Sequence, residues 1–101
     1  MAQFDVYKNL NKETLKEYPY LLDIQNDLFS NLNTRVVVPL AINFNPIKHL
    51  TPQFIINGDK VTMVTIEMAG VNKNLCSEFV MNLSDKRNEI IDAIDFMLNG
   101  F

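Results

Sequence analysis

The chain has 101 residues, 48% of them hydrophobic, and a formal net charge of −3 with a pI near 4.9. This length fits a single domain over residues 1–101, and the apolar content allows a small core, which excludes a disordered chain. Sequence-independent nucleic-acid binding needs Lys and Arg facing phosphates, so nine basic residues scattered among twelve acidic ones argue against it as the main activity.

Three strands are predicted in the first half of the chain. Alternating apolar residues in QFDVY (3–7) predict the first, YPYLLDIQ (18–25) predicts the second, and the β-branched stretch RVVVPLA (35–41) predicts a buried third. Pro19 suits the start or edge of its strand because it lacks an N–H, and Pro39 predicts an end or a bulge.

Polar segments separate these strands. The stretch 8–17 is punctuated by Asn and predicts a surface loop, as does NFNPIKHLTP (43–52). SNLNT (30–34) predicts a turn, because Ser and Asn side chains bond nearby backbone groups.

The clearest local signal is a hairpin over residues 53–70. Asn57-Gly58-Asp59 lies between two predicted strands, and Asn-Gly readily takes positive φ in hairpin turns. A further short strand is predicted over 75–83. In the second hairpin strand, alternation places Val61, Met63, Thr65 and Glu67 on one side and Thr62, Val64, Ile66 and Met68 on the other.

A helix is predicted to end the chain. Ser84 is a good N-cap, and Asp85 in the first turn complements the helix dipole. Gly100 stands where a left-handed C′ residue belongs. Ile90, Ile91, Ile94, Met97, Leu98 and Phe101 share one side, and Asn88, Glu89, Asp92, Asp95 and Asn99 share the other.

This order of antiparallel strands followed by one helix predicts an α+β, mainly β or barrel-like fold. No βαβ unit is visible, which argues against a nucleotide-binding doubly wound sheet.

The single Cys76 cannot form an internal disulfide, and His49 has no Cys or His cluster near it in sequence, which argues against a metal site or a Ser-His-Asp site. We expect Cys76 to be reduced and partly buried. No apolar run reaches membrane-spanning length, and we expect no signal peptide, no membrane contact, no cofactor and a reducing cytoplasmic location.

Phe96 falls in the middle of the polar face, among Glu89, Asp92 and Asp95. One interpretation is an aromatic binding surface, and the other is a local contact with Phe101 that closes the helix end. The three acids form a strip along the helix, which is either a solvated face or a site for arginines of a partner.

Two other features leave alternatives open. In NDLFS (26–30), Leu28 and Phe29 are adjacent in a loop, where one such residue usually tucks into the core and the other is exposed. Arg35 and Thr34, with Arg87, are candidates for a phosphate site of a metal-independent endoribonuclease, although such a site usually lies in a more basic groove.

Taken together, the segments resemble the CcdB family. The matching stretches are QF-VY (3–7), DIQND (23–27), R-V-PL (35–40), EMA-V (67–71), LS (83–84), N-I--AI and M--GF (88–101), and the departures in length lie in loops 8–17 and 41–50.

The resemblance implies an antiparallel SH3-like barrel sheet with a small side sheet and one C-terminal helix. It also implies a homodimeric toxin of a toxin–antitoxin system, without catalytic activity. Such a toxin binds the A subunit of DNA gyrase and traps the gyrase–DNA cleavage complex, and a CcdA-like antitoxin neutralises it.

The resemblance implies site residues as well. Gyrase contacts carry over to Asp92, Asp95, Asn99, Gly100 and Phe101 on the last helix, and to Asn26, Leu28 and Phe29 in a second patch. Met97 maps near the dimer axis.

Two positions depart from the family pattern. The best-known members carry Trp where this chain has Asn99, and that Trp stacks on a gyrase arginine. They end in Ile where this chain has Phe101. Phe96 lies on the same face, and our inference is that it supplies the missing ring.

Three functions therefore stand side by side: a gyrase poison, an endoribonuclease toxin of the same fold class, and a non-toxic homologue that only binds antitoxin.

Overall fold

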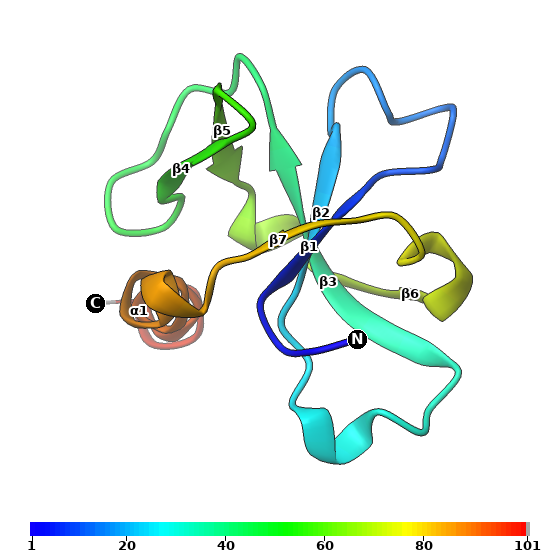
Figure 1. Cartoon of the computed structure of the whole chain (residues 1–101). Coiled ribbons are helices and arrows are strands. Elements are labelled where there is room, and N and C mark those ends of the chain that lie inside the picture. The colour runs from blue at the N-terminus through cyan, green and yellow to red at the C-terminus, as the bar shows by residue number, and fades with distance from the viewer. Residues whose placement is uncertain (101) are drawn as a thin grey trace.

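The computed structural model describes residues 1–100 as seven strands, four short 3₁₀ helices and one α-helix (Figure 1). The strands are β1 (Asp5–Lys8), β2 (Tyr20–Asp23), β3 (Thr34–Ala41), β4 (Gln53–Ile56), β5 (Asp59–Met63), β6 (Ala69–Asn72) and β7 (Phe79–Asn82). The 3₁₀ helices are η1 (Asp27–Phe29), η2 (Thr65–Glu67), η3 (Lys73–Leu75) and η4 (Ser84–Lys86), and α1 is Arg87–Asn99.

The strands form one antiparallel sheet in the order β4-β5-β3-β2-β1-β7. The smaller flank comes from β6, which pairs with Thr34–Val37 of β3, whereas Leu40 and Ala41 at the other end of β3 pair with β5. The sheet curls into a half-barrel, and α1 lies on one side of it (Figure 1). The predicted mainly β fold with an SH3-like sheet and one C-terminal helix is confirmed.

Pro39 neither ends β3 nor marks a bulge, so that prediction is wrong. The strand continues to Ala41, and its pairing with β2 runs without a shift from Val37 to Leu40. Pro39 lies between the part of β3 that pairs with β6 and the part that pairs with β5, so its missing N–H falls where β3 changes partner.

The core occupies both faces of the central strands. Val6, Leu22, Val38 and Leu40 are fully buried, and they pack in one cluster with Ile90 from α1. A second, smaller cluster contains Tyr7, Leu21, Val37 and Cys76. Asp5 and Tyr7 alternate with Phe4 and Val6 along the chain, and both are buried because this second cluster covers their face of the sheet.

The hairpin turn is confirmed, but the strand after it is shorter than predicted. Asn57 and Gly58 have φ values of 51° and 84°, as a two-residue hairpin turn requires. β5 ends at Met63 and η2 follows it. Residues 61–65 are all buried, so alternation does not divide a core side from a solvent side there.

Replacing Gly58 by Ala is expected to lower the free energy of unfolding by about 1–2 kcal/mol, because φ near +84° strains a residue with a Cβ. No heavy atom lies within 4 Å of the Cβ position, so the loss comes from backbone strain alone. Gly70→Ala is the matched control: it has the same free space without positive φ, and we expect a change within about 0.5 kcal/mol. Equal losses in urea unfolding would contradict the assignment of strain to the turn.

Candidate partner-binding surface

The end of α1 is shaped by Gly100. This residue has φ 79° and its N–H donates to the Phe96 carbonyl at 2.7 Å, which confirms the predicted left-handed residue at the helix end. Ile90 and Ala93 bury one face of α1 against the sheet, whereas Asp92 and Asp95 are exposed. Packing on the sheet therefore fixes one face of α1 while its acidic face is accessible.

Two predictions about this helix are wrong. Ser84 is not the N-cap: α1 begins at Arg87 after η4, and no side chain caps it. Ser84 instead donates its N–H to Asn82 Oδ1. Leu98 does not join the core, because the sheet reaches only one stripe of the helix and leaves Leu98 70% exposed.

A groove lies between α1 and the segment 46–53. Its volume is about 890 Å³, and all three acids of the predicted strip line it together with the helix tip. Phe96 is half-buried there and its ring lies 5.7 Å from the ring of His49. The prediction that Phe96 is a large exposed aromatic is therefore wrong, since the predicted loop 43–52 folds back against the helix. The lining residues are Pro46, Ile47, Lys48, His49, Thr51, Pro52, Gln53, Glu89, Asp92, Ala93, Asp95, Phe96, Asn99 and Gly100.

The alternative role for Phe96, a contact with Phe101, lies outside the described residues, as does the predicted gyrase contact at Phe101 itself.

The acidic strip is mostly uncompensated. Glu89 lies 4.0 Å from Lys86 in an exposed pair of the kind that contributes little to stability. Within residues 1–100, Asp92 and Asp95 make no ion pair. These two carboxylates are free to meet cationic side chains of a partner.

The second candidate patch is η1. Asn26 caps it by accepting the Leu28 N–H on its side-chain oxygen at 2.9 Å. Leu28 is 84% exposed and Phe29 is 54% exposed. The expectation that one of them tucks into the core is wrong, because η1 buries none of its residues. Two adjacent apolar side chains in water form a patch suited to a partner.

The two patches are separate but linked. Asn26, Leu28 and Phe29 do not line the groove. Gln3 connects η1 to the start of α1, because its N–H donates to Asp27 Oδ1 at 2.8 Å and its side-chain oxygen accepts from Arg87 Nη1 at 3.4 Å. Met97, the predicted dimer residue, is half-buried. The structure thus brings the predicted residues of α1 together along the groove, namely Asp92, Asp95, Phe96, Asn99 and Gly100. The η1 patch lies outside the groove and is linked through Gln3 to Arg87, at the opposite end of α1 from Gly100.

A family model described as CcdB protein matches residues 3–100. The chain belongs to the CcdB family. This family consists of toxins of toxin–antitoxin systems. Within residues 1–100, no helix is long and apolar enough to cross a bilayer.

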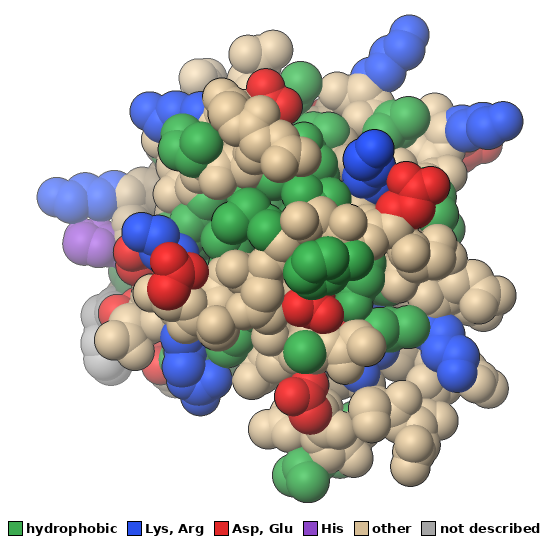
Figure 2. Space-filling model, viewed as in Figure 1, with side chains coloured by type: hydrophobic (Ala, Val, Ile, Leu, Met, Phe, Trp, Pro, Cys, Tyr) green, Lys and Arg blue, Asp and Glu red, His purple; other side chains and the backbone are tan. Residues whose placement is uncertain are grey.

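The arginines proposed for an endoribonuclease site do not form one in this CcdB-family chain. Arg35 is fully buried and paired with Asp23, and Arg87 lies over the ring of Phe4, 5.5 Å from its centroid. On the face shown in Figure 2, Lys and Arg side chains lie apart and are interspersed with acids. Neither arginine faces a shared groove, so the interpretation of Arg35, Thr34 and Arg87 as a phosphate site is wrong.

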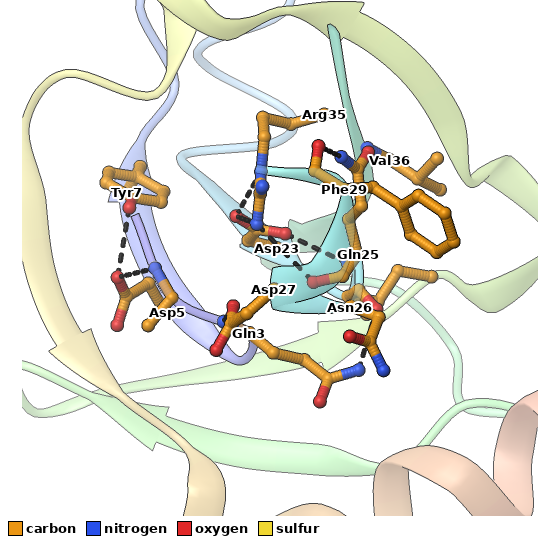
Figure 3. Close-up of polar contacts among 12 residues, drawn as sticks. Gln3, Asp5, Tyr7, Asp23, Gln25, Asn26, Asp27, Phe29, Arg35 and Val36 are labelled. Atoms are coloured by element: carbon orange, nitrogen blue, oxygen red, sulfur yellow. Dashed lines mark hydrogen bonds and ion pairs between the residues drawn. The ribbon is translucent and has the colours of Figure 1, made fainter. Parts of the chain in front are cut away.

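The buried pair was not predicted as a pair, although its charges are visible in the apolar strands 18–25 and 35–41. Arg35 Nε donates to Asp23 Oδ2 at 2.8 Å, and Nη2 lies 2.6 Å from the same oxygen (Figure 3). Both side chains are fully buried. Burial raises the pKa of Asp23, and the hydrogen bonds from Arg35 and from the Gln25 N–H oppose that rise.

Tyr7 and Cys76 lie beside this pair. Burial, followed by the hydrogen bond to Asp5, raises the pKa of Tyr7. Burial also raises the pKa of the Cys76 thiol to about 11, and the negative charge of Asp23 adds to the rise. Cys76, expected to be partly buried, is more buried than that because it belongs to the second core cluster. The raised pKa keeps its thiol protonated at neutral pH.

Stability is expected to fall in alkaline solution because the unfolded chain ionises Cys76 first. Its pKa is 9.0 when exposed and about 11 in the fold, so its contribution is complete below pH 9 and is lost as the pH rises through 11. The loss reaches about 2–3 kcal/mol in the free energy of unfolding. Urea titrations at pH 8 to 11 should show a shallower decline for Cys76→Ala than for the wild type, and parallel curves would contradict this assignment.

Proposed function

We propose that this CcdB-family chain is a gyrase poison. As a homodimer it binds the A subunit of DNA gyrase and holds the cleaved gyrase–DNA complex, without catalysing any reaction. A CcdA-like antitoxin neutralises it. The proposals about the dimer, gyrase and the antitoxin rest on the family membership together with the exposed acidic and apolar side chains of the two patches.

One observation supports the proposal most directly. The residues that carry over from the family's gyrase contacts, within the described part of the chain, are all on the surface or on the groove wall, and none takes part in the core. Leu28 is the most exposed of the large apolar residues in residues 1–100, a position that folding alone does not favour. Exposure of this kind suits a binding surface.

The dimer proposal has its own support. Met97 and Leu98 stand near the end of α1, and η2, which carries the 55% exposed Ile66, packs against this helix. Apolar surface of this kind is typical of homodimer interfaces.

The deciding experiment is a DNA cleavage assay with the host's gyrase holoenzyme. The proposal expects linear DNA to accumulate when the toxin is added, and to disappear when a CcdA-like peptide is present. Antitoxin binding without trapped cleavage complex would favour the non-toxic homologue instead, the alternative that Asn99 in place of Trp supports. Failure to bind either partner would overturn both.

Asn99→Trp is expected to strengthen binding to the gyrase A subunit by about tenfold, because Trp stacked on an arginine contributes about 1–2 kcal/mol when desolvated. Asn99 is exposed, so the fold has room for the ring. Phe96 does not replace that ring freely, since it packs against His49. Surface plasmon resonance with the gyrase A subunit measures the change, with Asn74→Trp at an exposed position in η3 as the control. Equal affinities for all three proteins would contradict stacking at position 99.

A further inference from the structure

The η1 turn lacks the usual sources of order. It is only three residues long and none of them is buried. Its local bonds are three: the Leu28 N–H to Asn26 Oδ1 at 2.9 Å, the Phe29 N–H to the Asn26 carbonyl at 3.0 Å, and the Ser30 N–H to the Asp27 carbonyl at 3.2 Å. Short 3₁₀ turns have poor hydrogen-bond geometry, and ordering each residue costs conformational entropy. A turn with two apolar side chains in water therefore needs support from outside.

Gln25 supplies such support from the sheet. Its side chain is buried and spans two elements (Figure 3). Nε2 donates to the Phe29 carbonyl at 2.9 Å, and Oε1 accepts from the Val36 N–H of β3 at 2.9 Å. One amide thus ties the last residue of η1 to the strand beneath it.

The buried ion pair fixes Gln25 in turn. Asp23 Oδ1 accepts from the Gln25 N–H at 2.9 Å, and Arg35 Nη2 donates to the Gln25 carbonyl at 3.4 Å. Both the donor and the acceptor of the Gln25 main chain are therefore occupied by fully buried charged groups. Hydrogen bonds to charged groups are stronger than neutral ones, so this anchor is stiff.

We infer that Gln25, anchored by the Asp23–Arg35 pair, is a positioning residue that holds Leu28 and Phe29 in their binding geometry. This inference rests on the proposed function, because it assigns a purpose to the order of η1. A turn fixed before binding does not have to be ordered during binding, which preserves affinity. Gln25 itself is buried and reaches the partner only through the turn.

The test compares Gln25→Leu with Asn9→Leu. Asn9 is an equally buried amide that holds a different segment, because its Nδ2 donates to Thr14 Oγ1 and to the Tyr18 carbonyl. Hydrogen exchange should accelerate about tenfold at the amides of 28–30 in Gln25→Leu only, and at those of 14–18 in Asn9→Leu only. Dissociation from the gyrase A subunit should accelerate about tenfold in Gln25→Leu and stay unchanged in Asn9→Leu.

A second variant keeps the test decisive if Gln25→Leu does not fold. Gln25→Glu keeps the size and the acceptor for Val36 but places a carboxylate against the Phe29 carbonyl, so faster exchange should be confined to 28–30 at pH 7. Unchanged exchange at 28–30 in every folded Gln25 variant would overturn the inference, whatever the binding result. Absence of gyrase binding by the wild type would instead remove the proposed function, while the exchange data would still decide whether Gln25 holds the turn.

Discussion

Arg35→Met is expected to lower the free energy of unfolding by about 3–5 kcal/mol, which is a large part of the total for a domain of this size. The substitution removes the guanidinium but leaves the Asp23 carboxylate buried without its cation. Urea unfolding followed by circular dichroism measures the loss directly.

The double variant Asp23→Asn with Arg35→Met distinguishes lost charge from lost packing. Asn keeps an acceptor for the Gln25 N–H and removes the isolated charge, so the double variant should recover more than half of the loss. Equal losses in the single and double variants would show that packing of the long Arg35 side chain, rather than ion pairing, is what the fold needs.

Gly100→Arg is expected to abolish growth inhibition and to weaken binding to the gyrase A subunit by at least about 100-fold. A cation at the helix tip repels the partner arginines that Asp92 and Asp95 are proposed to meet. The Cβ position at Gly100 is open, and the strain of positive φ, about 1–2 kcal/mol, falls at the end of the helix.

Gly70→Arg on β6 is the matched control, since it adds the same charge at an equally open glycine with no positive φ. It should leave toxicity unchanged. If cells expressing Gly100→Arg still stop growing, the assignment of the helix tip to gyrase binding fails. If both variants lose toxicity, added charge rather than position is responsible.

Local chemistry made much of the sheet predictable. The Asn57-Gly58 turn is specified by two neighbouring residues, and the β-branched run in β3 predicts a strand without knowledge of its partners. The 3₁₀ helices were missed because turns of three residues carry no periodicity. The end of β5 at Met63 was missed because both faces are buried there, so alternation gave a false continuation.

The site was predictable only in part for a similar reason. Gly100 follows from helix-ending chemistry, which is local. The packing of His49 against Phe96, by contrast, joins a residue from the middle of the chain to one near the end of α1, and no local pattern marks it. The same is true of Gln25, whose side chain is ordinary in sequence and becomes important through the two elements that it joins.

The pairing of β1 with β7 has a consequence for how the chain acquires its structure. Asp5 and Asn82 are hydrogen-bonded at a sequence separation of 77, so the sheet cannot close until most of the described chain is available. Sheets with such long-range pairing fold in about milliseconds to seconds, more slowly than helical bundles. During synthesis the first strand must wait for the seventh to emerge from the ribosome. α1 (Arg87–Asn99) begins soon after β7 (Phe79–Asn82), so the strand that closes the sheet and the helix that carries the acidic strip emerge one directly after the other.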